Sequence, residues 1–306
     1  MVEGVNASTS DHYRALILGA LAFAIGLASP AWAADRRWDS FEWVKAEVVP
    51  GAGLVKAGVV LPVKINGIDC YAQLDTGADG MIIWRTMYDT NAPFEEVLLD
   101  IAGKRRVVRA SALQLAAAID GTCKTTAIPT VGNAFFDDGT LILDLKGGRF
   151  RFDTAAILES EPKARHFQYA QLPGNQVGGH IIVQIGLPSG EVADAMLDTG
   201  AASFGLSTFT AADWNRLTGG LRLRASRSVK TYAVNSWGKQ ITCYSAEAPG
   251  SLLIAPELSV SHFRLSYCAG SSFKPRQELI GLLGLLHLND KVITLDYRSR
   301  KWLISN

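Results

Sequence analysis

The chain has 306 residues, of which 48% are hydrophobic and 19% are charged, and its formal net charge is +1. This is the composition of an ordinary globular protein with enough apolar residues to bury a core. Because there is no basic face or tail and no acidic block, we expect neither a nucleic-acid partner nor a solvating tail.

The N-terminal segment has the pattern of a secretory signal peptide. Arg14 precedes an uninterrupted apolar run over residues 15–28, and the small residues Ala31 and Ala33 then flank Trp32. A charged start, an apolar stretch and an A-x-A site are typical of export signals, and the run is short for a membrane span. We therefore expect a signal peptide over 1–33, a periplasmic or secreted product and no stable span in the mature form. The alternative is an uncleaved anchor.

The first half of the mature chain, residues 34–160, predicts a series of short strands. Residues 59–73 alternate apolar and polar side chains around an Asn-Gly pair, which is typical of a β-hairpin. The hairpin leads into the sequence LDTGA at 74–78. A second hairpin is predicted over 97–115, and a strand pair is predicted over 131–152.

The second half, residues 179–306, repeats this plan after a Pro- and Gly-containing link at 161–178. A hairpin over 180–196 leads into a second LDTGA at 197–201, and a hairpin over 231–246 follows. The segment 208–217 predicts a short helix with Thr208 or Thr210 as its N-cap.

Further landmarks recur in the same order in both halves. Twelve residues separate a Gly from an Asp in each half, and a large aromatic side chain follows that Asp by six. These residues are Gly132, Asp144 and Phe150 in the first half and Gly284, Asp296 and Trp302 in the second. The shared order indicates an internal duplication.

The two LDTGA segments each place a carboxylate where an apolar strand enters a Gly turn. A lone carboxylate buried there is costly. A pseudo-twofold relation between the halves would bring Asp75 and Asp198 together. Two carboxylates at one site share a proton and titrate as a unit. One then serves as general base toward a water, while the other donates a proton.

The chain resembles the clan AA aspartic proteases, the pepsin and retropepsin superfamily. The resemblance rests on the two LDTGA segments, the hairpin after each and the two later triplets 130–132 and 282–284. It implies an all-β fold of two retropepsin-like β-barrel lobes in one chain. It also implies an aspartic-type endopeptidase that hydrolyses a polypeptide substrate in the cleft between the lobes. In this comparison Asp75 and Asp198 are the catalytic residues, framed by Thr76, Gly77, Thr199 and Gly200.

Other features of the resemblance concern substrate contacts. One or both hairpins would serve as flaps. The first, with Gly103 in its turn, lacks a Tyr at its tip and carries the basic residues 104–106 instead. The second carries Tyr232 and Trp237, which either contact substrate or pack between elements. Asp79 is a further candidate for substrate contact; the Arg partner that retropepsins offer it is absent, which leaves its role open.

Four cysteines suit an exported protein, and three connectivities are possible. The candidates are Cys70, Cys123, Cys243 and Cys268, for which we expect pairing within each half, with free buried thiols as the alternative. No cofactor or metal is expected, since no further ligand cluster accompanies the two aspartates. Because one chain carries both, we expect a monomer. The rival to an enzyme is a non-catalytic peptide-binding protein that kept the bilobal fold.

Overall fold

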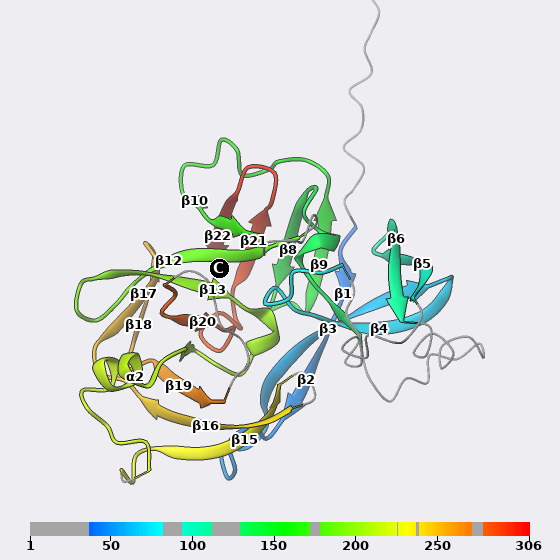
Figure 1. Ribbon diagram of the computed structural model, residues 1–306. Coiled ribbons are helices and arrows are strands. Elements are labelled where there is room, and N and C mark those ends of the chain that lie inside the picture. The colour runs from blue at the N-terminus through cyan, green and yellow to red at the C-terminus, as the bar shows by residue number, and fades with distance from the viewer. Residues whose placement is uncertain are drawn as a thin grey trace, which may run out of the picture. The chain divides into compact units, whose positions relative to one another are not determined.

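Strands make up most of the described chain, as the sequence predicted. The computed structural model describes residues 37–81, 94–111, 129–171, 178–224, 226–236, 239–270 and 278–306, without the side chains of 94, 95, 109–111 and 235. These residues form an all-β fold of three sheets (Figure 1). The expected signal peptide, Cys123 and Trp237 lie outside the described residues.

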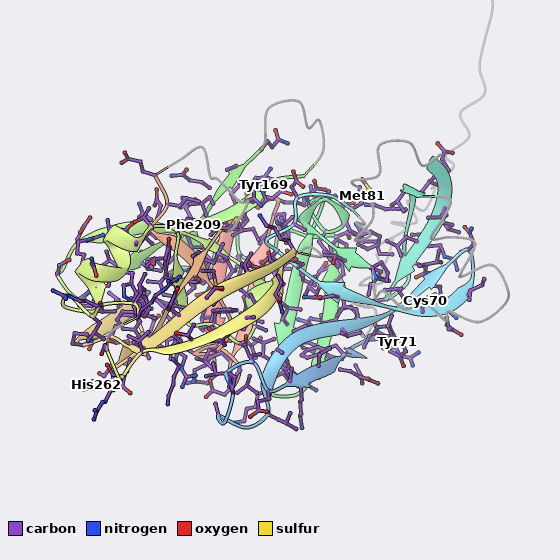
Figure 2. The ribbon with its side chains drawn as sticks, turned by 60° about the horizontal axis from the view of Figure 1, so that its bottom comes forward. Cys70, Tyr71, Met81, Tyr169, Phe209 and His262 are labelled. Atoms are coloured by element: carbon purple, nitrogen blue, oxygen red, sulfur yellow. A yellow bond between two sulfur atoms is a disulfide. The ribbon has the colours of Figure 1, made fainter. Side chains whose placement is uncertain are left out.

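One sheet comes from the first half of the chain, in the order β6-β5-β3-β4-β7 with β2 beside β3. Its strands are β2 (Glu42–Ala46), β3 (Val55–Ile65), β4 (Ile68–Leu74), β5 (Phe94–Ile101), β6 (Lys104–Ser111) and β7 (Thr130–Val131). Both predicted hairpins form, because Asn66-Gly67 and Ala102-Gly103 take the positive φ angles of tight two-residue turns. Along β4 the pleat buries Cys70 and exposes Tyr71 (Figure 2).

A second sheet comes from the second half, in the order β15-β16-β19-β14-β20-β13-β12-β17-β18 with β11 beside β12. Its strands are β11 (Gln168–Ala170), β12 (His180–Gly186), β13 (Val192–Leu197), β14 (Leu206–Thr208), β15 (Lys230–Ser236), β16 (Lys239–Glu247), β17 (Ser251–Ala255), β18 (Leu258–Ser261), β19 (Arg264–Ala269) and β20 (Gly281–Leu283). The predicted hairpins over 180–196 and 231–246 are both present as antiparallel pairs.

The third sheet takes strands from both halves, so the two repeats share it. Its order is β1-β9-β8-β21-β22-β10, and the green strands β8 and β9 lie beside the red β21 and β22 in Figure 1. The strands are β1 (Asp39–Ser40), β8 (Thr140–Asp144), β9 (Arg149–Asp153), β10 (Arg165–His166), β21 (Val292–Asp296) and β22 (Lys301–Ser305). β8 and β21 pair antiparallel along their full lengths.

This shared sheet explains the repeated landmarks. Asp144 and Asp296 each end a strand and organise the turn that follows: Asp144 accepts from the Gly147 amide at 2.7 Å, and Asp296 accepts from the Ser299 amide at 3.1 Å. Phe150 on the returning strand is fully buried, and its counterpart Trp302 is almost so. The Asp-turn-aromatic pattern therefore builds two equivalent hairpins.

The described part of the predicted link contains two short strands, and the predicted short helix is present. Residues 161–178 contribute β10 and β11 to two different sheets.

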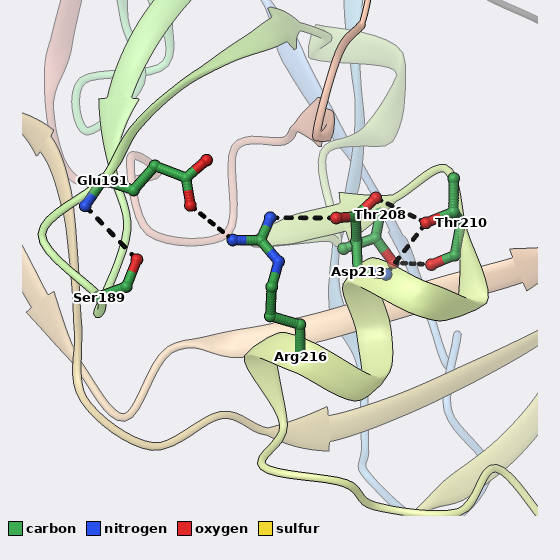
Figure 3. Close-up of polar contacts among 6 residues, drawn as sticks. All are labelled: Ser189, Glu191, Thr208, Thr210, Asp213 and Arg216. Carbon is green, nitrogen blue, oxygen red and sulfur yellow. Dashed lines mark hydrogen bonds and ion pairs between the residues drawn. The ribbon is translucent and has the colours of Figure 1, made fainter.

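The helix α2 (Ala211–Leu217) begins at Thr210, whose hydroxyl accepts from the Asp213 amide at 3.0 Å. Arg216 bonds Asp213 and Glu191, which ties the helix to the β12–β13 turn (Figure 3). Thr210, and not Thr208, is thus the N-cap.

A disulfide joins Cys243 of β16 to Cys268 of β19, which is the expected pairing within the second half. Cys70 is disulfide-bonded as well. The core is contiguous across both halves and includes Leu61, Leu74, Leu197 and Trp214. Within the described ranges, no helix is long and apolar enough to cross a membrane.

Candidate functional site

Two Asp loops form the candidate site, the first at residues 75–80 and the second at 198–203. Each begins where a strand ends, β4 in the first half and β13 in the second. Each of these strands runs parallel to a short apolar strand, with Leu74 opposite Val131 and Leu197 opposite Leu283. The Asp75 amide donates to the Val131 carbonyl at 3.0 Å, and the Asp198 amide donates to Leu283 at 2.9 Å.

The glycine after each apolar strand has a steric reason. A Cβ added at Gly132 would lie 2.5 Å from the Ala78 carbonyl oxygen, and one at Gly284 would lie 2.2 Å from that of Ala201. Because these contacts are to backbone, the two loops leave room for glycine alone. The apolar-apolar-Gly triplets in the sequence therefore mark the places where the Asp loops pack against a neighbouring strand.

The two loops are tied together by reciprocal hydrogen bonds of two buried threonines. The Thr76 amide donates to Thr199 Oγ1 at 3.0 Å, and the Thr199 amide donates to Thr76 Oγ1 at 3.1 Å. Each hydroxyl then donates across to the strand of the other half, Thr76 to the Leu197 carbonyl at 2.7 Å and Thr199 to that of Leu74 at 2.9 Å. These four bonds fix the two loops relative to each other.

Within this frame the carboxylates of Asp75 and Asp198 meet. A Cβ at Gly77 would lie 2.7 Å from the Asp198 carboxylate, and one at Gly200 would lie 2.6 Å from that of Asp75. Each carboxylate also accepts a local amide, Asp75 from Gly77 at 2.8 Å and Asp198 from Ala201 at 3.1 Å. Both glycines are therefore needed for the close approach of one loop to the other's carboxylate.

Burial and mutual repulsion change how the pair titrates. Burial, Coulomb repulsion from Asp198 and the hydrogen bond between the two carboxyls raise the pKa of Asp75 well above its usual value. Burial also raises the pKa of Asp198, opposed by hydrogen bonds from Asp75 and the local amides. Two such groups hold one proton between them over a wide pH range.

His180 is a neighbour of the pair that the sequence did not single out. It begins β12 and is buried, and burial lowers its pKa, while the charges of Asp79 and Asp198 oppose that shift. Its own charged form would lower the pKa of Asp198. A histidine at the start of a strand carries no local signal of this placement, since the first Asp loop lies far from it in sequence.

Of the remaining candidate residues, Asp79 lies in the first Asp loop, and Gly103 and Tyr232 belong to the later hairpins. Asp79 is half-buried in the first Asp loop, where its carbonyl accepts from the Ala134 amide at 3.2 Å. Gly103 lies exposed in the β5–β6 turn with a positive φ. Tyr232 is buried in a cluster with Ile241, Cys243 and neighbouring apolar residues, in line with the packing alternative for this ring. Trp237 lies outside the described residues.

The basic tip of the β5–β6 hairpin is neutralised by acidic residues that follow β7. Lys104 bonds Asp138, and Arg106 bonds Asp138 at 2.8 Å. The Lys104 ammonium also lies 4.0 Å from the centre of the Phe152 ring. The hairpin tip is therefore held against the segment 135–138 rather than extended into solvent.

An open cavity of about 560 Å³ lies on another surface and contains no residue of either Asp loop. His287 lines it, with Lys230, Arg264 and His262 (labelled in Figure 2). His287 Nε2 accepts from the Arg264 amide at 3.2 Å, so this side chain serves the packing of the fold. Among the described residues, no group of three or more His, Cys, Asp or Glu side chains could hold a metal ion.

Comparisons with known proteins do not add to this geometry. No protein-family model matches the chain, and the search of curated proteins gave no match.

Proposed function

We propose that the protein is an aspartic endopeptidase in which Asp75 and Asp198 form the catalytic pair. The observation that carries the proposal is the reciprocal bonding of Thr76 and Thr199, which joins two LDTGA loops separated by 123 residues. A structural role alone would not require two buried carboxylates to face each other, because such a pair is costly unless it shares a proton.

The proposed reaction uses the single proton on the pair. The ionised carboxylate takes a proton from a water held between the two, and the water oxygen attacks the peptide carbonyl carbon. The protonated carboxyl donates to the carbonyl oxygen as the tetrahedral intermediate forms. When the intermediate collapses, the C–N bond breaks and the amine leaves with a proton from the pair, while one hydroxyl of the intermediate returns its proton to the pair as the carboxyl product forms. The pair returns to its one-proton state, and no covalent enzyme intermediate forms.

The finer architecture is part of the same proposal. We regard the two halves as retropepsin-like lobes that share the sheet containing β8 and β21. A polypeptide substrate would bind between the lobes, and the enzyme would act as a monomer. The antiparallel pairing of β8 with β21 supports this, because it gives each half the same closing hairpin. Export through the N-terminal 1–33 segment belongs to the proposal as well.

The test is a peptide-library digest read by mass spectrometry for wild type, Asp75→Asn and Asp198→Asn. Either substitution removes an ionisable carboxyl while keeping its shape, and we expect a rate loss of at least ~10³-fold, about 4 kcal/mol of transition-state stabilisation. Asp69→Asn is the matched control, since Asp69 is exposed and bonds Lys64. Full activity in Asp198→Asn would remove the pair from the reaction. A wild type that binds peptides without cleaving them would favour the non-catalytic alternative.

A further inference from the structure

Asn133 lies directly after Gly132, and its side chain is completely buried against the first Asp loop. Its carboxamide nitrogen donates to the Thr76 carbonyl at 2.7 Å and to the Gly179 carbonyl at 2.8 Å. Its carboxamide oxygen accepts from the Tyr297 hydroxyl at 2.8 Å. One side chain thus joins the first Asp loop, the segment entering the second half and the residue after β21.

The partners leave this amide one orientation. Two carbonyl oxygens can only accept, so the carboxamide NH₂ must face them, and its oxygen must face the hydroxyl. The backbone of Asn133 adds to this, because its own amide donates to the Ala78 carbonyl at 3.0 Å. Side chain and backbone therefore hold the first Asp loop at two points on opposite sides of Gly77.

The segment entering the second half passes equally close to the loop. Gly178 has a positive φ of 87°, and a Cβ there would lie 1.8 Å from the Asp79 carbonyl oxygen. Gly179 then offers its carbonyl to Asn133. Tyr297 completes the arrangement: its ring packs edge-on against Phe167 and Tyr169. The partners of Asn133 are thus themselves held by packing.

The second Asp loop has no counterpart of this amide. The residue after Gly284, at the position equivalent to Asn133, is Leu285, which is fully buried in the apolar core. Both halves therefore share the strand, the Asp and the glycines. Of the two equivalent positions, the one beside the first Asp loop holds a polar anchor and the other holds a leucine. An element that breaks the symmetry of the repeat requires an explanation beyond folding of the repeat.

We propose that Asn133 is a positioning residue, which fixes the Thr76 peptide and thereby the direction in which the Asp75 carboxylate points toward Asp198. This rests on the proposed function. Tyr297 supports it by holding the carboxamide. The Thr76 carbonyl belongs to the peptide unit whose N–H, on Gly77, donates to the Asp75 carboxylate at 2.8 Å. A shift of this peptide therefore moves that donor and the carboxylate bonded to it. The reaction depends on carboxylate placement to within a fraction of an ångström.

Two substitutions test the anchor at different strengths. Asn133→Asp keeps the shape but turns an oxygen toward two carbonyl oxygens, so the loop loses both donors when the new carboxyl is ionised. Tyr297→Phe removes one hydroxyl and leaves both loop contacts intact. Tyr169→Phe is the matched control, because Tyr169 is half-buried in the same aromatic cluster and the substitution removes its buried hydroxyl without touching Asn133.

We expect kcat to fall about 10²-fold for Asn133→Asp and about threefold to tenfold for Tyr297→Phe, with KM unchanged within about twofold. Tyr169→Phe should match wild type. The Asn133→Asp loss should shrink as the pH falls, because a protonated carboxyl regains one donor. The other charged or titratable groups around Tyr297 and the pair are Tyr169, Asp137, Arg300, Asp79 and His180, and these stay the same.

A second measurement does not depend on activity. Carbon-13 NMR of labelled aspartate carboxyls should show that Tyr297→Phe, which adds no charge near the pair, changes the titration of the Asp75–Asp198 pair, while Tyr169→Phe does not. If wild type cleaves peptides and all three variants keep its kcat and its titration, the positioning role is overturned. If wild type cleaves nothing yet Tyr297→Phe, which adds no charge, alters the titration of the pair, the proposed function fails and the positioning of Asp75 stands.

Discussion

Gly77→Ala should disable the site while leaving the fold almost unchanged. A Cβ at this position would lie 2.7 Å from the Asp198 carboxylate carbon and from Oδ1, and 2.8 Å from Oδ2. Ordinary contacts to a Cβ begin at 3.4 Å, so the carboxylate has to move by roughly 0.7 Å (3.4 minus 2.7). The carboxylate is the end of a side chain, so it moves in preference to the backbone. Gly77 has no positive φ, so alanine brings no backbone strain there.

The size of the effect follows from that displacement. A misplacement of about 1 Å costs a reaction about 10²-fold, so 0.7 Å should lower kcat roughly tenfold to 10²-fold, or about 1.4–2.7 kcal/mol. The thermal midpoint should change by less than about 5 °C, because little buried surface is lost. The assay is single-turnover cleavage of a peptide found in the library digest, with circular dichroism to measure unfolding.

Gly58→Ala provides the control for this substitution. A Cβ at Gly58 in β3 would meet nothing closer than 3.8 Å, so the same chemical change there has room. We expect wild-type kcat from Gly58→Ala. If Gly77→Ala retained wild-type kcat with its fold intact, the close approach of loop and carboxylate would have no role in the reaction, and the argument from geometry would be refuted.

Three further predictions concern pH, assembly and stability. Residues 78 and 201 each donate a backbone amide to a carboxylate of the pair. Ala78→Ser and Ala201→Ser should add a hydroxyl donor at the same place and so lower the pKa of the pair. The alkaline limb of the pH–rate profile should then move down by roughly one pH unit. Activity needs the shared proton, and wild type, with its raised pKa, should work best in the mildly acidic to neutral range; an optimum below pH ~4 would contradict this. Activity per mole should stay constant on dilution, because one chain carries both aspartates, whereas a cooperative loss would indicate assembly from two chains. Replacing Cys243 and Cys268 together by Ala should lower the free energy of unfolding by about 3–4 kcal/mol in urea titration, since the disulfide closes a loop of 25 residues.

Local features of the fold could be predicted from the sequence because they depend on neighbouring residues. The Asn66-Gly67 pair supplies positive φ angles without any tertiary contact, so the first hairpin follows from two residues. The same holds for the Ala102-Gly103 turn. It also holds for the start of the α2 helix, where the Thr210 hydroxyl accepts from the Asp213 amide three residues later. The duplication itself predicted that Asp75 and Asp198 act together.

Contacts across long sequence separations were decided by the tertiary structure alone. Lys104 and Arg106 lie at the tip of the hairpin predicted over 97–115, and they bond acidic residues more than thirty positions away. Tyr232 had two interpretations, and its burial in the β15–β16 cluster came from packing that no local pattern encodes. Residues 161–178 looked like a link, but edge strands β10 and β11 form there because neighbouring sheets offer them partners.

The sequence by itself determined that two Asp loops exist and that they are related by duplication. How they meet depended on Thr76 and Thr199, whose hydroxyls find carbonyls 121 and 125 residues away. The anchor at Asn133 depended on three partners from three segments, the farthest 164 residues along the chain. The sequence shows which residues can donate a hydrogen bond but not which groups accept it. The acceptors depend on tertiary packing, because a buried polar group has to pair with whichever partner the fold places beside it.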